Sequence, residues 1–219
     1  MNFDLAFTAW TIAPILSVAG TTVLITIASC IGAVALGFGF ELGRRSRFGP
    51  GYAMQFVIDF IRSTPLLAWL YFLYYVLPYY GVVLPALVVG MLGLSIYFSG
   101  YLAEVFKAGI DSIPKGQGEA ATALGMNDRD TMLLIIAPQM LRNVAAPIGN
   151  YFVSILKATP YLAVIAVPEM LGKALEIASS TYRYAEPLIV AGIAFLALAL
   201  ITAQLVHVLE RRLRSPFTR

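Results

Sequence analysis

Hydrophobic residues occur in five long runs that are separated by shorter polar segments. The runs cover residues 15–40, 52–77, 83–106, 131–156 and 187–207. A helix needs about 20 apolar residues to cross a bilayer, whereas a barrel strand needs only about 9–11. Backbone groups inside the hydrocarbon must also find hydrogen-bond partners within the protein. The pattern therefore predicts an all-α integral membrane protein with five transmembrane helices.

Two segments between the runs are too polar to cross a membrane. Residues 107–130 contain the stretch GQGEAATALG, and residues 157–187 contain the short apolar piece YLAVIAVPEML. We expect the second segment to form a half-inserted helix at an outer mouth or a loop that receives a soluble protein. The two roles are compatible with each other.

The composition supports a membrane location and excludes several other classes of protein. Hydrophobic residues make up 59% of the chain and charged residues 12%, whereas a soluble domain has about 25% charged residues. The single cysteine cannot form an internal disulfide, and one histidine gives little basis for a metal site. A net charge of +3 does not indicate a nucleic-acid surface. We expect a lipid bilayer around the chain and no metal, cofactor or nucleic acid.

The basic residues predict the orientation in the membrane, because they accumulate on the cytoplasmic side. If the loop containing Arg44, Arg45 and Arg47 is cytoplasmic, ten of the 15 lysines and arginines lie inside and three lie outside. The N-terminus is then outside and the C-terminus inside. The N-terminal stretch carries Asp4 and no basic residue, so we expect it to be retained and not cleaved as a signal peptide.

The polar break at residues 111–130 has the signals of a short capped helix. Pro114 ends the preceding element, and EAATALGM contains strong helix formers. Gly125 suits a left-handed helix end, and Asn127 or Asp128 can cap the next helix. A helix of about two turns is unstable alone in water, so it must dock on the chain or on another protein. A well-capped surface turn is the alternative interpretation.

The run EAATALG resembles the EAA signature of permease subunits from binding-protein-dependent ABC importers. Other segments are similar to the polar amino acid branch of that family, namely FIRSTPLLAWLYFLYYVLP (60–78), YLAEVFKAGIDSIPKGQ (101–117), PQMLR (138–142) and PIGNYFVSILKATP (147–160). The resemblance implies a type I (MetI-like) permease fold over residues 15–208. Residues 1–14 would form an outer segment and residues 209–219 a cytoplasmic basic tail. It also implies a bacterial inner membrane and a polar amino acid or similar zwitterion, such as histidine, glutamine, arginine, an opine or ectoine.

In this family the EAA helix docks on a cytoplasmic ATPase dimer, which supplies the energy for transport. The resemblance also implies a second permease, identical or homologous, and an external substrate-binding protein. The chain has no phosphate-binding GxxxxGK[ST] loop, so ATP hydrolysis is expected in the partner and the chain is not expected to be an enzyme. It departs from the family pattern at Gly118, where an aromatic residue is usual. The expected ATPase-coupling residues are Gly116, Glu119, Ala120, Ala121, Leu124 and Gly125.

Charged and polar residues within the runs are candidates for a translocation path, because such groups are costly in a membrane. The candidates are Arg62, Thr64, Pro65, Asn150, Lys157 and Glu169. Two local ion pairs are competing interpretations. Arg62 is spaced to pair with Asp59, and Glu104 is spaced to pair with Lys107. Ala158 stands where many relatives have an acidic residue, which disfavours a cationic substrate.

An ion-gradient-driven secondary carrier is the alternative function. The sequence shows no inverted repeat and no cluster of acidic residues in the membrane that would couple to ions. A membrane enzyme lacks paired catalytic carboxylates at one depth. A structural scaffold would explain the spans but not the capped polar helix between them.

Overall fold

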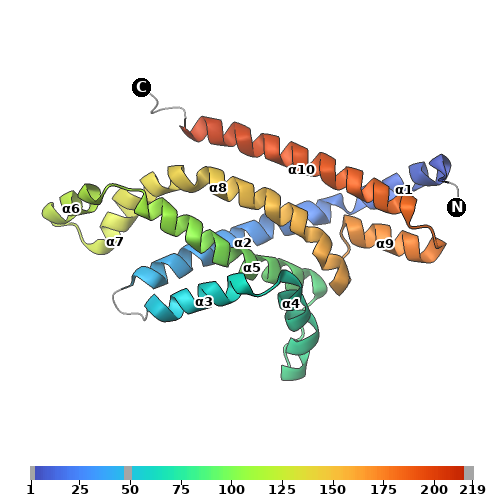
Figure 1. The fold of residues 1–219 in the computed structure, drawn as a ribbon, viewed down its shortest axis with the longest axis horizontal. Helices are drawn as coiled ribbons and strands as arrows, with labels where there is room; N and C mark the ends of the chain where they lie inside the picture. Colours follow the sequence, from blue (N-terminus) through green and yellow to red (C-terminus); the bar gives the residue numbers. More distant parts are fainter. Residues whose placement is uncertain (1–2, 47–50, 215–219) are drawn as a thin grey trace.

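The computed structural model describes residues 3–46 and 51–214, and its regular elements there are helices (Figure 1). Short π-helical segments cover Phe72–Val76 and Thr131–Ile136, and 3₁₀ segments cover Leu77–Tyr80 and Thr159–Ile165. The α-helices are α1 (Leu5–Ser17), α2 (Ala19–Arg45), α3 (Gly51–Ser63), α4 (Leu66–Tyr71), α5 (Ala86–Asp111), α6 (Lys115–Ala123), α7 (Asp128–Asp130), α8 (Ala137–Ala158), α9 (Met170–Thr181) and α10 (Ala185–Arg214).

Four apolar helical segments in the described residues are long enough to cross a membrane, and a bent pair can supply a fifth span. The first covers Leu5–Arg45 and begins ten residues before the predicted run. Asp4 caps this helix by accepting hydrogen bonds from the backbone N–H groups of Ala6 and Phe7, at 2.8 and 3.1 Å. The helix therefore includes most of the segment expected to precede the membrane domain. At the other end, α10 continues to Arg214 and takes in part of the predicted tail.

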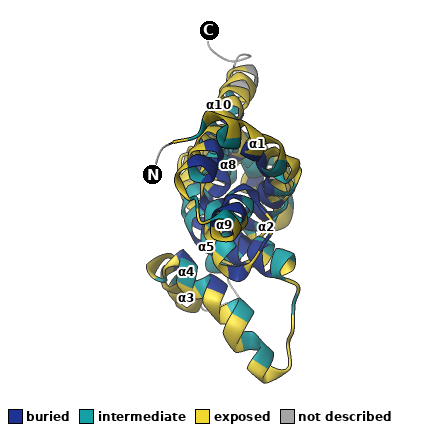
Figure 2. Ribbon diagram, turned by 90° about the vertical axis from the view of Figure 1, so that its right-hand side faces the viewer, coloured by how far each residue is buried: buried dark blue, intermediate teal, exposed yellow. Residues whose placement is uncertain are grey.

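The second hydrophobic run is broken next to Pro65, the proline that interrupts it in the sequence. It divides into Gly51–Ser63 and Leu66–Tyr80, which meet at an angle of 99°. Proline lacks a backbone N–H, and it disfavours helical geometry in the residue before it. Pro65 therefore sets the position of the break. Residues 66–80 begin on the main core, where Leu66 and Leu70 are buried, and then project from the bundle as an arm (Figures 1 and 2).

The main hydrophobic core joins α2, α4, α5 and α8. Its fully buried side chains include Ile25, Leu94, Leu102 and Phe106. Helices α2 and α5 approach closely at Gly37, where an added Cβ would lie 2.9 Å from the Cβ of Leu102. A second core, centred on Ile15, Met170, Ala174 and Val190, joins α1, α9 and α10.

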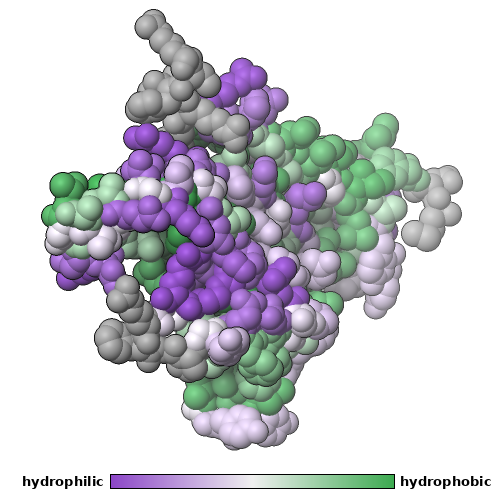
Figure 3. Space-filling model, turned by 60° about the vertical axis from the view of Figure 1, so that its left-hand side comes forward, coloured by the Kyte–Doolittle hydropathy of each residue, from purple (hydrophilic) through white to green (hydrophobic). Residues whose placement is uncertain are grey.

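The outer surface of the bundle is largely apolar, as expected for contact with lipid. Helix α10 exposes Ile193, Leu196, Leu200, Ile201 and Leu205. Hydrophilic residues gather at the end of the molecule that carries α6, while apolar residues cover the adjoining flank (Figure 3). The polar end and the apolar sides together match a protein that crosses a bilayer.

Candidate coupling helix and membrane pocket

Helix α6 has the length and the end that the sequence predicted. It contains nine residues. Its end is closed by two backbone hydrogen bonds, from Gly125 to the Thr122 carbonyl at 3.0 Å and from Met126 to the Ala121 carbonyl at 3.1 Å. The backbone of Gly125 is in the left-handed region, with φ +77°, as this pair of hydrogen bonds requires. The side chain of Asn127 then caps α7 by accepting from the backbone N–H of Asp130 at 2.8 Å.

Most of the predicted coupling residues lie on the exposed side of α6. Leu124 is 81% exposed, although it is a large apolar side chain. Ala121 is instead only 3% exposed and faces the rest of the chain. Its small side chain thus serves the packing of α6 on its own protein. The exposed predicted residues are Gly116, Glu119, Ala120, Leu124 and Gly125.

Helix α8 is hydrogen-bonded both to α6 and to the segment that precedes α6. The side-chain amide of Gln139 donates to the Gln117 side-chain oxygen at 3.3 Å, and that of Asn143 donates to the Ser112 hydroxyl at 2.9 Å. A hollow of about 720 Å³ lies beside α6 and is lined by Gly118 and Ile136 among others. A Cβ added at Gly118 would have no neighbour within 4 Å. The missing aromatic residue therefore leaves open space and does not disturb the helix.

A pocket of about 440 Å³ lies among α4, α5 and α8, within the membrane-spanning part of the chain. Lys157 is the charged residue in its lining, and the tyrosine hydroxyls supply most of the other polar groups. An ammonium group among hydroxyls is suited to binding a small anionic group. The lining residues are Leu66, Tyr97, Phe98, Tyr101, Tyr151, Ser154, Lys157, Ala158 and Tyr161.

Arg62 lies next to this pocket. Its guanidinium carbon is 5.6 Å from the centre of the Tyr101 ring, and the Tyr101 hydroxyl donates to the Arg62 carbonyl at 3.3 Å. Arg62 also forms the predicted ion pair with Asp59, at 3.7 Å. Pro65 immediately precedes the pocket residue Leu66, and the Thr64 hydroxyl donates to the Phe60 carbonyl at 2.7 Å. The structure thus brings the Arg62 region and Lys157 to the same group of tyrosines.

Two other predicted path residues do not line this pocket. Asn150 is exposed on α8, and its carbonyl accepts a hydrogen bond from Ser154. Glu169 is fully buried and caps α9, accepting from the backbone N–H groups of Leu171 and Gly172. Burial raises the pKa of the Glu169 carboxyl from its ordinary 4.5 to about 6, although the two backbone hydrogen bonds lower it. The position of Glu169 is that of a helix cap.

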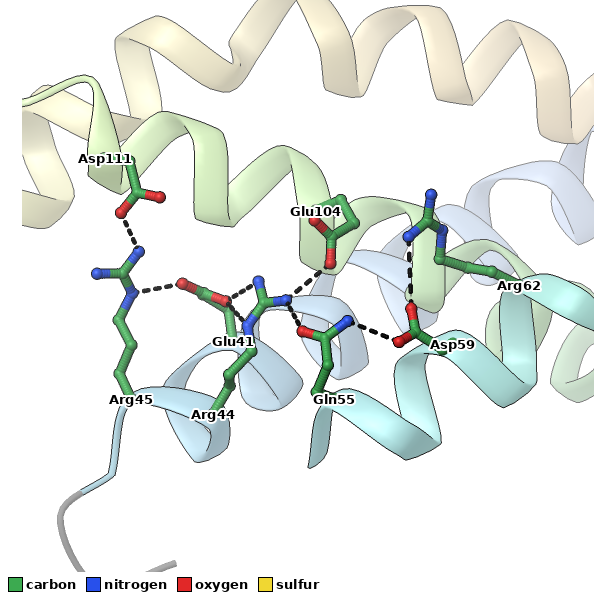
Figure 4. Close-up of polar contacts among 8 residues, drawn as sticks. All are labelled: Glu41, Arg44, Arg45, Gln55, Asp59, Arg62, Glu104 and Asp111. Carbon is green, nitrogen blue, oxygen red and sulfur yellow. Dashed lines mark hydrogen bonds and ion pairs between the residues drawn. The ribbon is translucent and has the colours of Figure 1, made fainter. Parts of the chain in front are cut away.

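A polar cluster at the α6 end was not foreseen from the sequence (Figure 4). Its centre is Glu41, whose side chain has no exposed surface and pairs with both Arg44 and Arg45. Glu104 does not form the expected pair with Lys107, because its carboxylate binds Arg44 at 2.7 Å. The i, i+3 and i, i+4 spacings in ELGRR were the available signal.

A second charged cluster ties the start of α1 to the start of α10. Arg183 pairs with Asp4 and Glu186, and its guanidinium carbon is 4.3 Å from the centre of the Phe7 ring. The hydrogen bond from the Phe7 backbone, aided by Arg183, lowers the pKa of Asp4. No group of three or more His, Cys, Asp or Glu residues is placed to hold a metal ion within residues 3–46 and 51–214.

Comparison with known proteins assigns the family. The family described as "Binding-protein-dependent transport system inner membrane component" matches residues 33–215. A probable amino-acid ABC transporter permease of Sinorhizobium fredii is 37% identical over 95% of this chain and 91% of its own length. The arginine transport system permease ArtQ of Bacillus subtilis is 32% identical over 98% of this chain and 99% of its own.

Solved structures agree with this assignment. The crystal structure of an amino acid ABC transporter with histidines has a TM-score of 0.87 and 32% identity, covering 97% of this chain and all of the other. The MetNI methionine transporter, at 12% identity and a TM-score of 0.77 over 91% of this chain and 96% of the other, supports the fold alone. The chain therefore belongs to the inner membrane components of binding-protein-dependent transport systems, and it is a multi-pass permease subunit of an ABC importer, a transport component and not an enzyme.

Proposed function

We propose that this permease imports a polar amino acid or a similar small zwitterion, and that α6 is the contact through which an ATPase dimer drives it. A permease of this family works with ATPase subunits and a substrate-binding protein. The observation that carries the proposal is the exposed face of α6. Leu124 is 81% exposed there, at a helix end that two backbone hydrogen bonds close. The orientation expected from the basic residues, with the C-terminus inside, puts this face in the cytoplasm.

The membrane pocket supports an amino acid substrate. The ammonium of Lys157 is suited to the carboxylate that every amino acid carries, and the tyrosine hydroxyls can donate or accept hydrogen bonds. No Asp or Glu is among the described residues of the pocket lining. This composition favours a substrate with a neutral or acidic side chain over arginine or lysine. Two related permeases, one named for amino-acid transport and the other for arginine transport, support an amino acid as the general class of substrate.

The arm of residues 66–80 supports pairing with a second permease, identical or homologous. It exposes Tyr71, Phe72, Tyr75, Tyr79 and Tyr80, and much of its backbone is π-helical or 3₁₀. Irregular backbone at membrane depth is tolerated where protein or a water-filled cavity covers it, and not against lipid. A second permease on this side would cover the arm and close the path.

Purification of the permease from native membranes in mild detergent tests the proposal. We expect an ATPase to copurify, and we expect Leu124→Lys to release it, because a charge replaces an apolar contact. Uptake of labelled amino acids by proteoliposomes containing both proteins should require ATP. Transport by the permease alone, driven by an ion gradient without ATP, would contradict the proposal and favour a secondary carrier.

A further inference from the structure

The buried carboxylate of Glu41 joins the ends of three helices near α6. Its two oxygens contact different arginines, Oε2 binding Arg44 and Oε1 binding Arg45 (Figure 4). A buried carboxylate is strongly destabilising unless it is paired, so both arginines are held toward Glu41. Their positions are therefore coupled through one side chain that has no contact with solvent.

The two arginines reach different helices. Arg44 Nη1 donates to Gln55 of α3 at 2.6 Å and to Glu104 of α5 at 2.7 Å. Arg45 Nη2 donates to Asp111, the last residue of α5. Glu41 thus connects the end of α2 to the start of α3 and to two points on α5.

One branch of this cluster ends directly beside α6. Only residues 112–114 separate Asp111 from Lys115, where α6 begins. The buried side chains of Ile110 and Ile113 anchor this region in the core, and the Arg45 contact adds a polar link from the last residue of α5 to α2. With the contact in place, the end of α5 is fastened to α2.

The other branch extends along α3 toward the membrane pocket. Gln55 donates to Asp59 at 3.0 Å, and Asp59 pairs with Arg62. Near Arg62, α3 packs closely on α5, since a Cβ added at Gly100 would lie 2.9 Å from Ile61 and 3.0 Å from Arg62. Polar contacts at one end and tight packing at the other therefore make α2, α3 and α5 a single stiff body that carries part of the pocket.

We propose that Glu41 is a positioning residue for energy coupling, which holds α2, α3 and α5 together so that displacement of α6 reaches the pocket. The inference rests on the proposed role of α6. It assigns a function in transport to Glu41, a buried carboxylate that belongs neither to the exposed face of α6 nor to the pocket lining. Breaking the cluster should leave the ATPase bound while the pocket stops responding to it.

The test measures the response of the pocket to the nucleotide state of the ATPase. Ser154 is an exposed residue of the pocket lining. Ser154→Cys is introduced together with Cys30→Ala, which removes the one native thiol. The rate of reaction with a water-soluble maleimide is measured on the purified permease–ATPase complex, with and without a non-hydrolysable ATP analogue. Because coupling between sites is typically 5–150-fold, we expect the rate to change by about fivefold or more in this parent protein.

Two variants then break the cluster at different points. Glu41→Gln removes the buried charge, and Asp111→Asn weakens the Arg45 contact at a side chain that is 51% exposed, where folding is little affected. Both should reduce the nucleotide response to less than about twofold while the ATPase still copurifies. Asp111→Glu, which keeps the charge, should restore most of the response. The matched control is Glu176→Gln, which breaks the Lys173–Glu176 pair on α9 and should leave the response unchanged.

The outcomes separate this inference from the proposed function. A full response in Asp111→Asn or in a folded Glu41→Gln complex would overturn the role of the cluster while leaving the coupling role of α6 intact. In the double variant, the loss should be no larger than that of the stronger single variant, because the two residues act through one connection. Losses that multiply would also overturn the inference. A parent protein that binds no ATPase, or whose pocket ignores the nucleotide, would overturn the proposed function and this inference with it.

Discussion

Leu124→Ala is the substitution that best separates docking from folding. Leu124 is 81% exposed at the end of α6, so its side chain adds little to the stability of the permease itself. The change removes three carbon atoms, which are worth about 0.8 kcal/mol each when fully buried. With about four fifths of that surface available to a partner, the expected loss is roughly 2 kcal/mol of binding free energy. This corresponds to roughly a 30-fold weaker contact with the ATPase.

The assay has two readouts and a matched control. Binding of the purified ATPase to the permease in lipid nanodiscs gives the dissociation constant, and thermal unfolding of the permease alone gives its stability. We expect the dissociation constant to rise while the unfolding temperature stays the same. Leu196→Ala makes the same chemical change on the exposed face of α10, where Leu196 is 59% exposed, and it should leave ATPase binding unchanged.

Either of two results would refute the reasoning on Leu124. An unchanged dissociation constant would show that no partner buries this side chain. A clear fall in the unfolding temperature of the isolated permease would show that the side chain stabilises its own fold, contrary to its exposure. Both measurements are needed, because weaker binding from a partly unfolded α6 would otherwise resemble the loss of a contact.

Three further predictions follow from single positions. Gly125→Asp should fold, because a Cβ there meets nothing within 4 Å and Asp tolerates a positive φ. The charge of the new side chain should reduce ATP-dependent uptake more than the isosteric Gly125→Asn does. Equal uptake by the two variants would contradict a docked turn. Lys157→Met should raise the KM for uptake about 10-fold or more, the value of a hydrogen bond to a charged group, with Lys173→Met as the control for the same change outside the pocket. Glu169→Gln keeps a cap acceptor without a charge, so the wild type should lose stability relative to this variant as the pH rises from about 4.5 to about 6. The difference should reach about 2 kcal/mol and then stay constant, whereas parallel pH profiles of thermal unfolding would contradict the raised pKa.

Local signals in the sequence were sufficient to predict α6 and its surroundings. The glycine at position 125 and the cap at Asn127 act over one turn of helix, so no distant partner was needed to recognise them. Which side of α6 faces the protein could not be predicted in the same way. Ala120 and Ala121 are identical residue types, and only the packing against the segment 131–136 distinguishes the buried one from the exposed one.

Features that depend on distant partners were predicted less well. Pro65 indicated a break in the second run, but the 99° angle depends on how the two pieces pack. The spacing of Glu104 and Lys107 suggested a local pair, yet Arg44 lies 60 residues away in the sequence and takes the carboxylate. A planar guanidinium can bind several oxygens at once, so it outcompetes a flexible ammonium when both are within reach. Sequence spacing shows that a local pair is possible and not that a distant one is absent.

The positions of the charges explain why the bundle can be stiff and still transmit motion. Away from the α6 end, α2 and α5 carry hydroxyls that bond to carbonyls of the helices, as when Thr26 donates to Thr22 and Ser95 to Met91. These bonds impose no charge on the interior, and the close contact at Gly37 prevents the two helices from sliding. The charges that bind α2 to α5 are gathered at the α6 end, around Glu41, whereas the Arg183 cluster binds the start of α1 to the start of α10. A displacement of α6 thus acts on a part of the bundle where ion pairs join α2 to α5. We expect these helices to move together, because separating them would break the ion pairs.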